Sequence, residues 1–105
     1  MYKRFLKIFG IMAIFSMVLT AGQTGKMTGK VLDKETGNPL PGVNVLLEGT
    51  SMGAATDANG EFYVMEVPPG LYSVQFSFIG FTSLNISNVR STVDLTTNMG
   101  TINLE

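Results

Sequence analysis

Hydrophobic and polar residues alternate in short runs through most of the chain, beginning near residue 27. The clearest run is 71–78, where one side carries Tyr72, Val74, Phe76 and Phe78, and the other carries Ser73, Gln75 and Ser77. A period of two is typical of a strand with one buried and one solvated face. We therefore expect the aromatic side of this run to be buried and the Ser-Gln-Ser side to be accessible.

The rest of the chain after Gln23 follows the same pattern, and no stretch shows a sustained helical period. Turn-forming residues recur about every eight to twelve positions, which is the spacing of a β-sandwich or barrel. Seven short strands fit. They are predicted at 27–33, 43–48, 52–56, 61–67 and 71–78, with Leu84 and Ile86 continuing a strand beyond a bend at Gly80, and 93–95 and 102–104 close the set.

Glycines, prolines and Asx residues separate these strands. Gly tolerates positive φ and Pro interrupts a strand ladder, so these clusters predict turns. Asp57-Ala58-Asn59-Gly60 is predicted to be a tight hairpin connection in which Asn59 and Gly60 accept positive φ. The predicted structural turn residues are Gly37, Pro39, Pro41, Gly42, Asp57, Asn59, Gly60, Pro69 and Gly70.

Inward-facing positions of the predicted strands supply a modest core, which about 80 residues are long enough to bury. An aromatic platform for a ligand would need exposed rings, whereas the rings here alternate inward, so we interpret them as core. The predicted core residues are Val31, Val43, Val45, Phe62, Tyr72, Val74, Phe76 and Phe78.

The first residues have the composition of an export signal. Met1 to Lys7 is cationic, Ile8 to Leu19 is apolar, and small residues follow before Gln23. An apolar run this short makes a helix of roughly 18 Å, less than the ~30 Å hydrocarbon core, so cleavage is favoured over a retained anchor. The prediction is a signal peptide at 1–22, cut after Ala21 or Gly22, and one domain at 23–105.

The residue inventory excludes much chemistry. The sequence has no Cys and no His, which removes disulfides, thiolate nucleophiles, Cys/His zinc sites and imidazole catalysis. Without the three cations of the first seven residues, four Lys/Arg stand against eight Asp/Glu, so nucleic acid is not an expected partner. No catalytic residue, metal site or cofactor is predicted. Asp57 to Glu61 resembles a calcium loop only faintly and is better explained as a turn. Glu61 and Glu66 are predicted to lie on opposite faces of one strand, so they are not expected to form an acid–base pair.

Six short motifs carry a family resemblance. In order and spacing they resemble the carboxypeptidase regulatory-like domain across nearly the whole predicted domain. The resemblance implies a seven-stranded transthyretin-like and carbohydrate-binding-like Greek-key β-sandwich. The motifs are Thr28-Gly29-Lys30-Val31-x-Asp33, Gly37-x-Pro39-Leu40-Pro41-Gly42-Val43-x-Val45, Gly49-Thr50, Thr56-Asp57-x-x-Gly60-x-Phe62, Pro69-Gly70-x-Tyr72-x-Val74 and Ile79-Gly80-Phe81.

This family resemblance implies two settings: behind a metallocarboxypeptidase domain, or ahead of the plug of a TonB-dependent outer-membrane receptor. A signal peptide directly before the domain favours the second. We expect a non-catalytic interaction or structural module of the periplasm or outer membrane. It would be the N-terminal extension or a truncated fragment of an uptake receptor, with protein partners from that complex. The alternative is a stand-alone secreted sandwich that binds a glycan or a protein, and strand addition at an open edge is a further way to recruit a partner.

Overall fold

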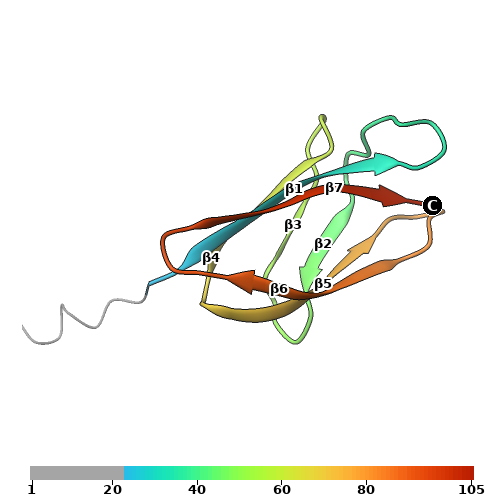
Figure 1. Ribbon diagram of the computed structural model, residues 1–105. Helices are drawn as coiled ribbons and strands as arrows, with labels where there is room; N and C mark the ends of the chain where they lie inside the picture. Colours follow the sequence, from blue (N-terminus) through green and yellow to red (C-terminus); the bar gives the residue numbers. More distant parts are fainter. Residues whose placement is uncertain (1–22) are drawn as a thin grey trace, which may run out of the picture.

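The computed structural model describes residues 23–105, which form strands and connecting loops without a helix (Figure 1). The predicted signal segment, 1–22, lies outside these residues. Seven strands follow the chain in order. They are β1 (Gly25–Asp33), β2 (Asn44–Leu47), β3 (Gly53–Ala55), β4 (Glu61–Val67), β5 (Gly70–Ser77), β6 (Leu84–Ser91) and β7 (Thr96–Leu104).

The strands form two sheets, so the prediction of a seven-stranded all-β sandwich is confirmed. One sheet has three strands in the order β4-β1-β7, with β1 antiparallel to β4 and parallel to β7. The other has four antiparallel strands in the order β3-β2-β5-β6. The parallel pair joins the first and last strands, so the sandwich closes only when both ends of the domain are in place.

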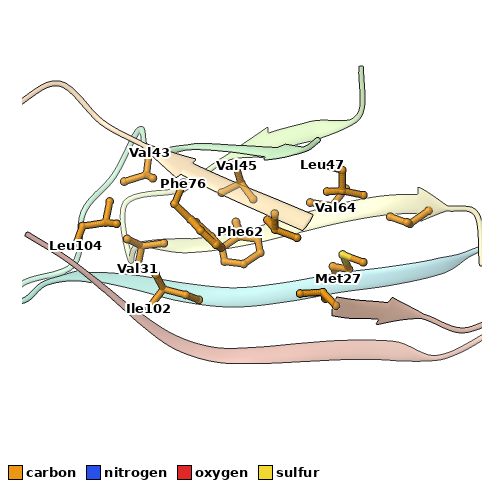
Figure 2. Close-up of a cluster of buried hydrophobic side chains, with 13 residues drawn as sticks. Met27, Val31, Val43, Val45, Leu47, Phe62, Val64, Phe76, Ile102 and Leu104 are labelled. Atoms are coloured by element: carbon orange, nitrogen blue, oxygen red, sulfur yellow. The ribbon is translucent and has the colours of Figure 1, made fainter. Parts of the chain in front are cut away.

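Side chains from both sheets meet in one apolar core (Figure 2). Phe62 of β4 and Phe76 of β5 pack edge to face across the sandwich, with ring centroids 5.5 Å apart. Such a pair adds about 0.5–1.5 kcal/mol to the free energy gained from burial of the rings. Of the predicted core, Tyr72 and Phe78 are half-buried beside the cluster, and the other six residues are buried: Val31, Val43, Val45, Phe62, Val74 and Phe76.

Two details of the predicted strand pattern are wrong. Val93-Asp94-Leu95 is a turn between β6 and β7, in which the Leu95 N–H donates to the Thr92 carbonyl and Asp94 has a φ of 59°. The last strand begins at Thr96 and is much longer than 102–104. Its first three residues are polar, and the parallel pairing with β1, which is distant in sequence, holds them in the sheet.

The connection 57–60 is a tight turn but not a hairpin. β3 lies at one edge of the four-stranded sheet and β4 at an edge of the three-stranded sheet, so this turn carries the chain between sheets. Of the predicted Asn59-Gly60 pair, Gly60 takes a positive φ, 75°, and Asn59 does not. Local sequence shows where the chain turns, but the sheet that the next strand joins is decided by long-range pairing.

The four edge strands are short or interrupted. β3 has three residues. In each of β4, β6 and β7, two residues oppose one residue of the neighbouring strand, and one of the two has positive φ: Glu66 (55°), Asn88 (61°) and Gly100 (74°). Bulges and short strands are devices that keep edges from pairing with other chains. Continuous addition of a partner strand is therefore disfavoured at each edge.

Candidate functional site

The outer face of the four-stranded sheet presents a surface without charged side chains at its centre. We call it the neutral face. Strand alternation turns these residues outward because their neighbours in sequence, among them Val45, Val74 and Phe76, fill the core. The neutral face consists of Asn44 and Leu46 of β2, Gly53 and Ala55 of β3, Ser73, Gln75 and Ser77 of β5, and Asn85 of β6.

A shallow groove of about 480 Å³ crosses the neutral face, and its lining includes Leu46, Gly53, Gln75 and Ser77. Leu46 is 39% exposed, and the predicted accessible residues Ser73, Gln75 and Ser77 are half-buried. The nearest charges along the strands, Glu48 and Arg90, lie toward one end. Because no ion has to be desolvated at its centre, this face can be covered by another protein at little electrostatic cost.

The outer face of the three-stranded sheet has the opposite character, and we call it the tyrosine face. It consists of Thr28 and Lys30 of β1, Glu61 and Tyr63 of β4, and Asn98 and Thr101 of β7. Tyr63 is 56% exposed and stands opposite Thr28, which in turn stands opposite Asn98. Together with Gly29 and Gly100, these residues line a hollow of about 280 Å³.

Hydrogen bonds orient several groups of the tyrosine face. The Tyr63 hydroxyl donates to Glu61 Oε2 at 3.0 Å, and this bond to a carboxylate raises the pKa of Tyr63. The Gly100 N–H donates to Asn98 Oδ1 at 2.8 Å across the bulge of β7. Thr28 Oγ1 donates to the Phe62 carbonyl at 3.0 Å. Sequence reasoning missed this surface, although Tyr63 alternates with the inward Phe62 and Val64.

The predicted turn residues lie in or beside the connections that join the two sheets. Apart from Gly60, which is buried, they are exposed. Asp57 Oδ1 accepts the N–H groups of Asn59 at 2.9 Å and Glu61 at 3.0 Å, the geometry of an Asx turn. The carboxylate that suggested a faint calcium loop is thus engaged with backbone. The exposed turn residues do not gather at one place: Gly37, Pro39, Pro41 and Gly42 lie between β1 and β2, whereas Pro69 lies between β4 and β5 and Gly70 begins β5.

Thr56 is a buried polar residue that sequence reasoning did not single out. Its hydroxyl accepts the Val43 N–H at 2.9 Å and donates to the Leu40 carbonyl. Its backbone carbonyl accepts the Gly42 N–H at 2.9 Å. One side chain thereby fixes the Leu40–Val43 segment against the end of β3. The Thr-Asp pair in the motif pattern marked this position, but only the structure shows what the hydroxyl does.

The acidic residues Glu61 and Glu66 lie near opposite ends of β4 and do not form a catalytic pair. Glu61 belongs to the tyrosine face, and Glu66 sits in the bulge near the other end of β4. Within residues 23–105, no group of three or more His, Cys, Asp or Glu side chains could hold a metal ion. The described part of the chain also contains no helix long and apolar enough to cross a membrane.

The fold defines a class of protein, a small β-sandwich domain of seven strands in two sheets. The chain belongs to the CarboxypepD_reg-like domain family, whose model matches residues 27–105. The family resemblance drawn from the six motifs is thus confirmed.

Two TonB-dependent receptors of Formosa agariphila are similar in sequence. One is 36% identical over 91 residues, covering 84% of this chain and 9% of the receptor. The other is 38% identical over 64 residues, covering 61% of this chain and 6% of the receptor. The chain therefore spans less than a tenth of the length of either receptor.

Solved structures share the sandwich. A chain of a type II cohesin–X–dockerin complex from Acetivibrio cellulolyticus superposes with a TM-score of 0.66 at 26% identity, covering 76% of this chain and 56% of that one. A candidate carbohydrate-binding protein from Bacteroides uniformis (TM-score 0.59, 18% identity) covers 79% of this chain and 42% of its own. The 5-hydroxyisourate hydrolase of Klebsiella pneumoniae (TM-score 0.53, 22% identity) covers 79% and 88%. The last two likenesses concern the fold alone.

Proposed function

We propose that this domain is a non-catalytic protein-interaction module of a TonB-dependent uptake receptor, exported by a cleaved signal peptide at 1–22 and facing the periplasm. The observation that carries the proposal is the 36% identity to a TonB-dependent receptor over 84% of the chain. A non-catalytic role is supported by the absence of Cys and His from the sequence. His is the most frequent general acid or base in enzymes, and Cys is a common nucleophile.

The surface proposed for this contact is the neutral face. Protein interfaces are depleted of charged residues at their centre, and the neutral face meets that condition while the tyrosine face does not. Strand addition is the weaker mode because bulges or shortness interrupt every edge strand of the described domain. The partner assigned to the neutral face is a periplasm-facing part of the receptor complex itself.

Site-specific photo-crosslinking in the native host tests the contact. The full chain, made from its own gene with a photo-reactive residue at Gln75, should form an adduct with a TonB-dependent receptor on illumination. The same probe at Asn59, an exposed turn position, is the matched control and should not. Leu46→Asp should weaken the Gln75 adduct about tenfold or more, whereas Leu95→Asp, at a residue 59% exposed on the β6–β7 turn, should leave it unchanged. Fractionation of the chain with the cytosol, or equal adducts at both probe positions, would overturn the proposal.

Two further measurements test the signal peptide and the receptor setting of the proposal separately. Mass spectrometry of the exported protein should show a first residue after Ala21 or Gly22. Reading the DNA downstream of the Glu105 codon distinguishes an N-terminal extension from a stand-alone domain. An in-frame or frameshifted plug and barrel supports the extension, and an unrelated gene after a stop codon supports the alternative.

A further inference from the structure

The hollow on the tyrosine face combines one exposed aromatic ring with polar groups of both kinds. Tyr63 projects from the edge strand β4, and the middle strand β1 and the opposite edge strand β7 supply Lys30, Asn98 and Thr101. At about 280 Å³ the hollow lies just below the ~300–1,000 Å³ range of small-molecule pockets. Its size suits one or two rings of a ligand that continues into solvent.

The hydrogen bonds of the face define what a ligand could add. Glu61 uses Oε2 for the Tyr63 hydroxyl, and Asn98 uses Oδ1 for the Gly100 N–H. Within residues 23–105, the salt bridge that forms joins Lys34 to Glu105, away from Lys30. The Asn98 amide nitrogen and the Lys30 ammonium can therefore donate to a ligand, while Glu61 Oε1 accepts, and the Thr101 hydroxyl does either.

These donors and acceptors on the tyrosine face favour ligand groups that can both donate and accept a hydrogen bond. One cation and one anion, Lys30 and Glu61, stand opposite each other on neighbouring strands, so a ligand of either charge meets attraction and repulsion together. A hydroxyl group can satisfy a donor and an acceptor at once. An aromatic side chain with a polar tip offers an apolar surface for the C–H face of a sugar ring.

We propose that the tyrosine face binds a sugar ring of a neutral oligosaccharide, with Tyr63 as the stacking platform. An extended peptide fits this place less well, because the bulge of β4 at Glu66 interrupts the edge along which it would pair. The site lies on the other sheet from the neutral face, so it is independent of the protein contact proposed above. Its open shape makes weak binding the expectation.

The test is an amide chemical-shift titration of the full chain with maltohexaose, cellohexaose and laminarihexaose, and with a Gly-Ser hexapeptide as the peptide probe. At least one sugar should shift the amides of Thr28, Lys30, Tyr63 and Asn98, with a dissociation constant of order 1 mM. The hexapeptide should shift none of them.

Matched variants tie the binding to the ring. Tyr63→Ala should weaken binding about tenfold or more, and Tyr63→Phe should stay within about threefold because the ring remains. Leu71→Ala removes a side chain of similar exposure, 58%, on the other sheet and should change nothing. The amide spectrum of each variant shows directly whether it is folded. No shift with any sugar, equal binding by Tyr63→Ala, or shifts at these amides with the hexapeptide would each overturn the proposal.

Discussion

Gly60 and Gly80 both take positive φ, 75° and 86°, and each belongs to a turn between consecutive strands. The Gly80 turn joins β5 and β6, neighbours in one sheet, and a Cβ placed on Gly80 would meet no atom within 4 Å. The Gly60 turn joins strands of different sheets, and a Cβ there would lie 2.5 Å from the Val31 carbonyl oxygen. The Gly80 turn has open space around it, whereas the Gly60 turn packs against the end of β1.

Backbone hydrogen bonds explain why Gly60 has no space around it. Val31 donates its N–H to the Gly60 carbonyl at 2.7 Å and accepts the Leu40 N–H at 3.0 Å. The end of β1 therefore pairs through one residue, Val31, with both the Gly60 turn and the loop before β2. Both glycines belong to the motif pattern, but Gly80 is needed for its backbone angle alone and Gly60 for its angle and its lack of a side chain.

The largest expected effect belongs to Gly60→Ala. The substitution adds the cost of a left-handed non-glycine residue, about 1–2 kcal/mol, to a contact with backbone that cannot move without breaking two hydrogen bonds. We expect a loss of about 3 kcal/mol or more in the free energy of unfolding, or roughly 12–24 °C in Tm. Urea and thermal unfolding of the full chain measure it. A loss no larger than that of Gly80→Ala would contradict the role of space at Gly60.

Thr56→Val extends the comparison to the side chain that anchors the same region. The methyl group that replaces the hydroxyl leaves the Val43 N–H and the Leu40 carbonyl without their side-chain partner. An unsatisfied buried group costs about 1–3 kcal/mol, so we expect a loss of about 2 kcal/mol. Thr56→Ser keeps the hydroxyl and removes one methyl, and should cost about 1 kcal/mol. If both variants lose equal stability, burial of the methyl and not the hydroxyl holds the loop.

Gly80→Ala should have the smallest effect on stability of the three. Since nothing lies within 4 Å of the added Cβ, only the left-handed backbone angle opposes the change, at about 1–2 kcal/mol. Ile79, beside it, is 95% exposed, so Ile79→Ser should change the free energy of unfolding by less than about 0.5 kcal/mol. A loss at Gly80 equal to that at Gly60 would show that backbone angle alone explains both glycines.

The same contrast explains how far the sequence could predict this molecule. Alternation is a local property, and the inward faces of β1, β2 and β5 follow it because one side of each strand has to be apolar. Other features depend on partners distant in the chain. They are the change of sheet at Gly60, the parallel pairing of β7 with β1, and the bulges at Glu66 and Asn88. Of the two candidate surfaces, the Ser73-Gln75-Ser77 side was predicted from its strand, whereas the tyrosine face needs three strands brought together.

The last and smallest expected effect comes from charge, since acidic residues lie beside the Gly60 turn in the sequence and none lies beside Gly80. Asp57 and Glu61 flank Gly60, and the hydrogen bond from the Tyr63 hydroxyl to Glu61 raises the pKa of Tyr63, with a further contribution from Asp57. Ionised Tyr63 would face a carboxylate, so the folded protein holds the phenol proton to higher pH than the unfolded chain. The stabilisation is present below the unfolded pKa and is lost as the pH rises through the folded pKa.

Glu61→Gln should therefore move the titration of Tyr63, followed by NMR of labelled tyrosine rings, to lower pH. Asp57→Asn should move it less, and Gly80→Ala not at all. A titration unchanged by Glu61→Gln would mean that the bond does not persist in solution, and it would leave the Glu61 carboxylate fully open to a ligand on the tyrosine face.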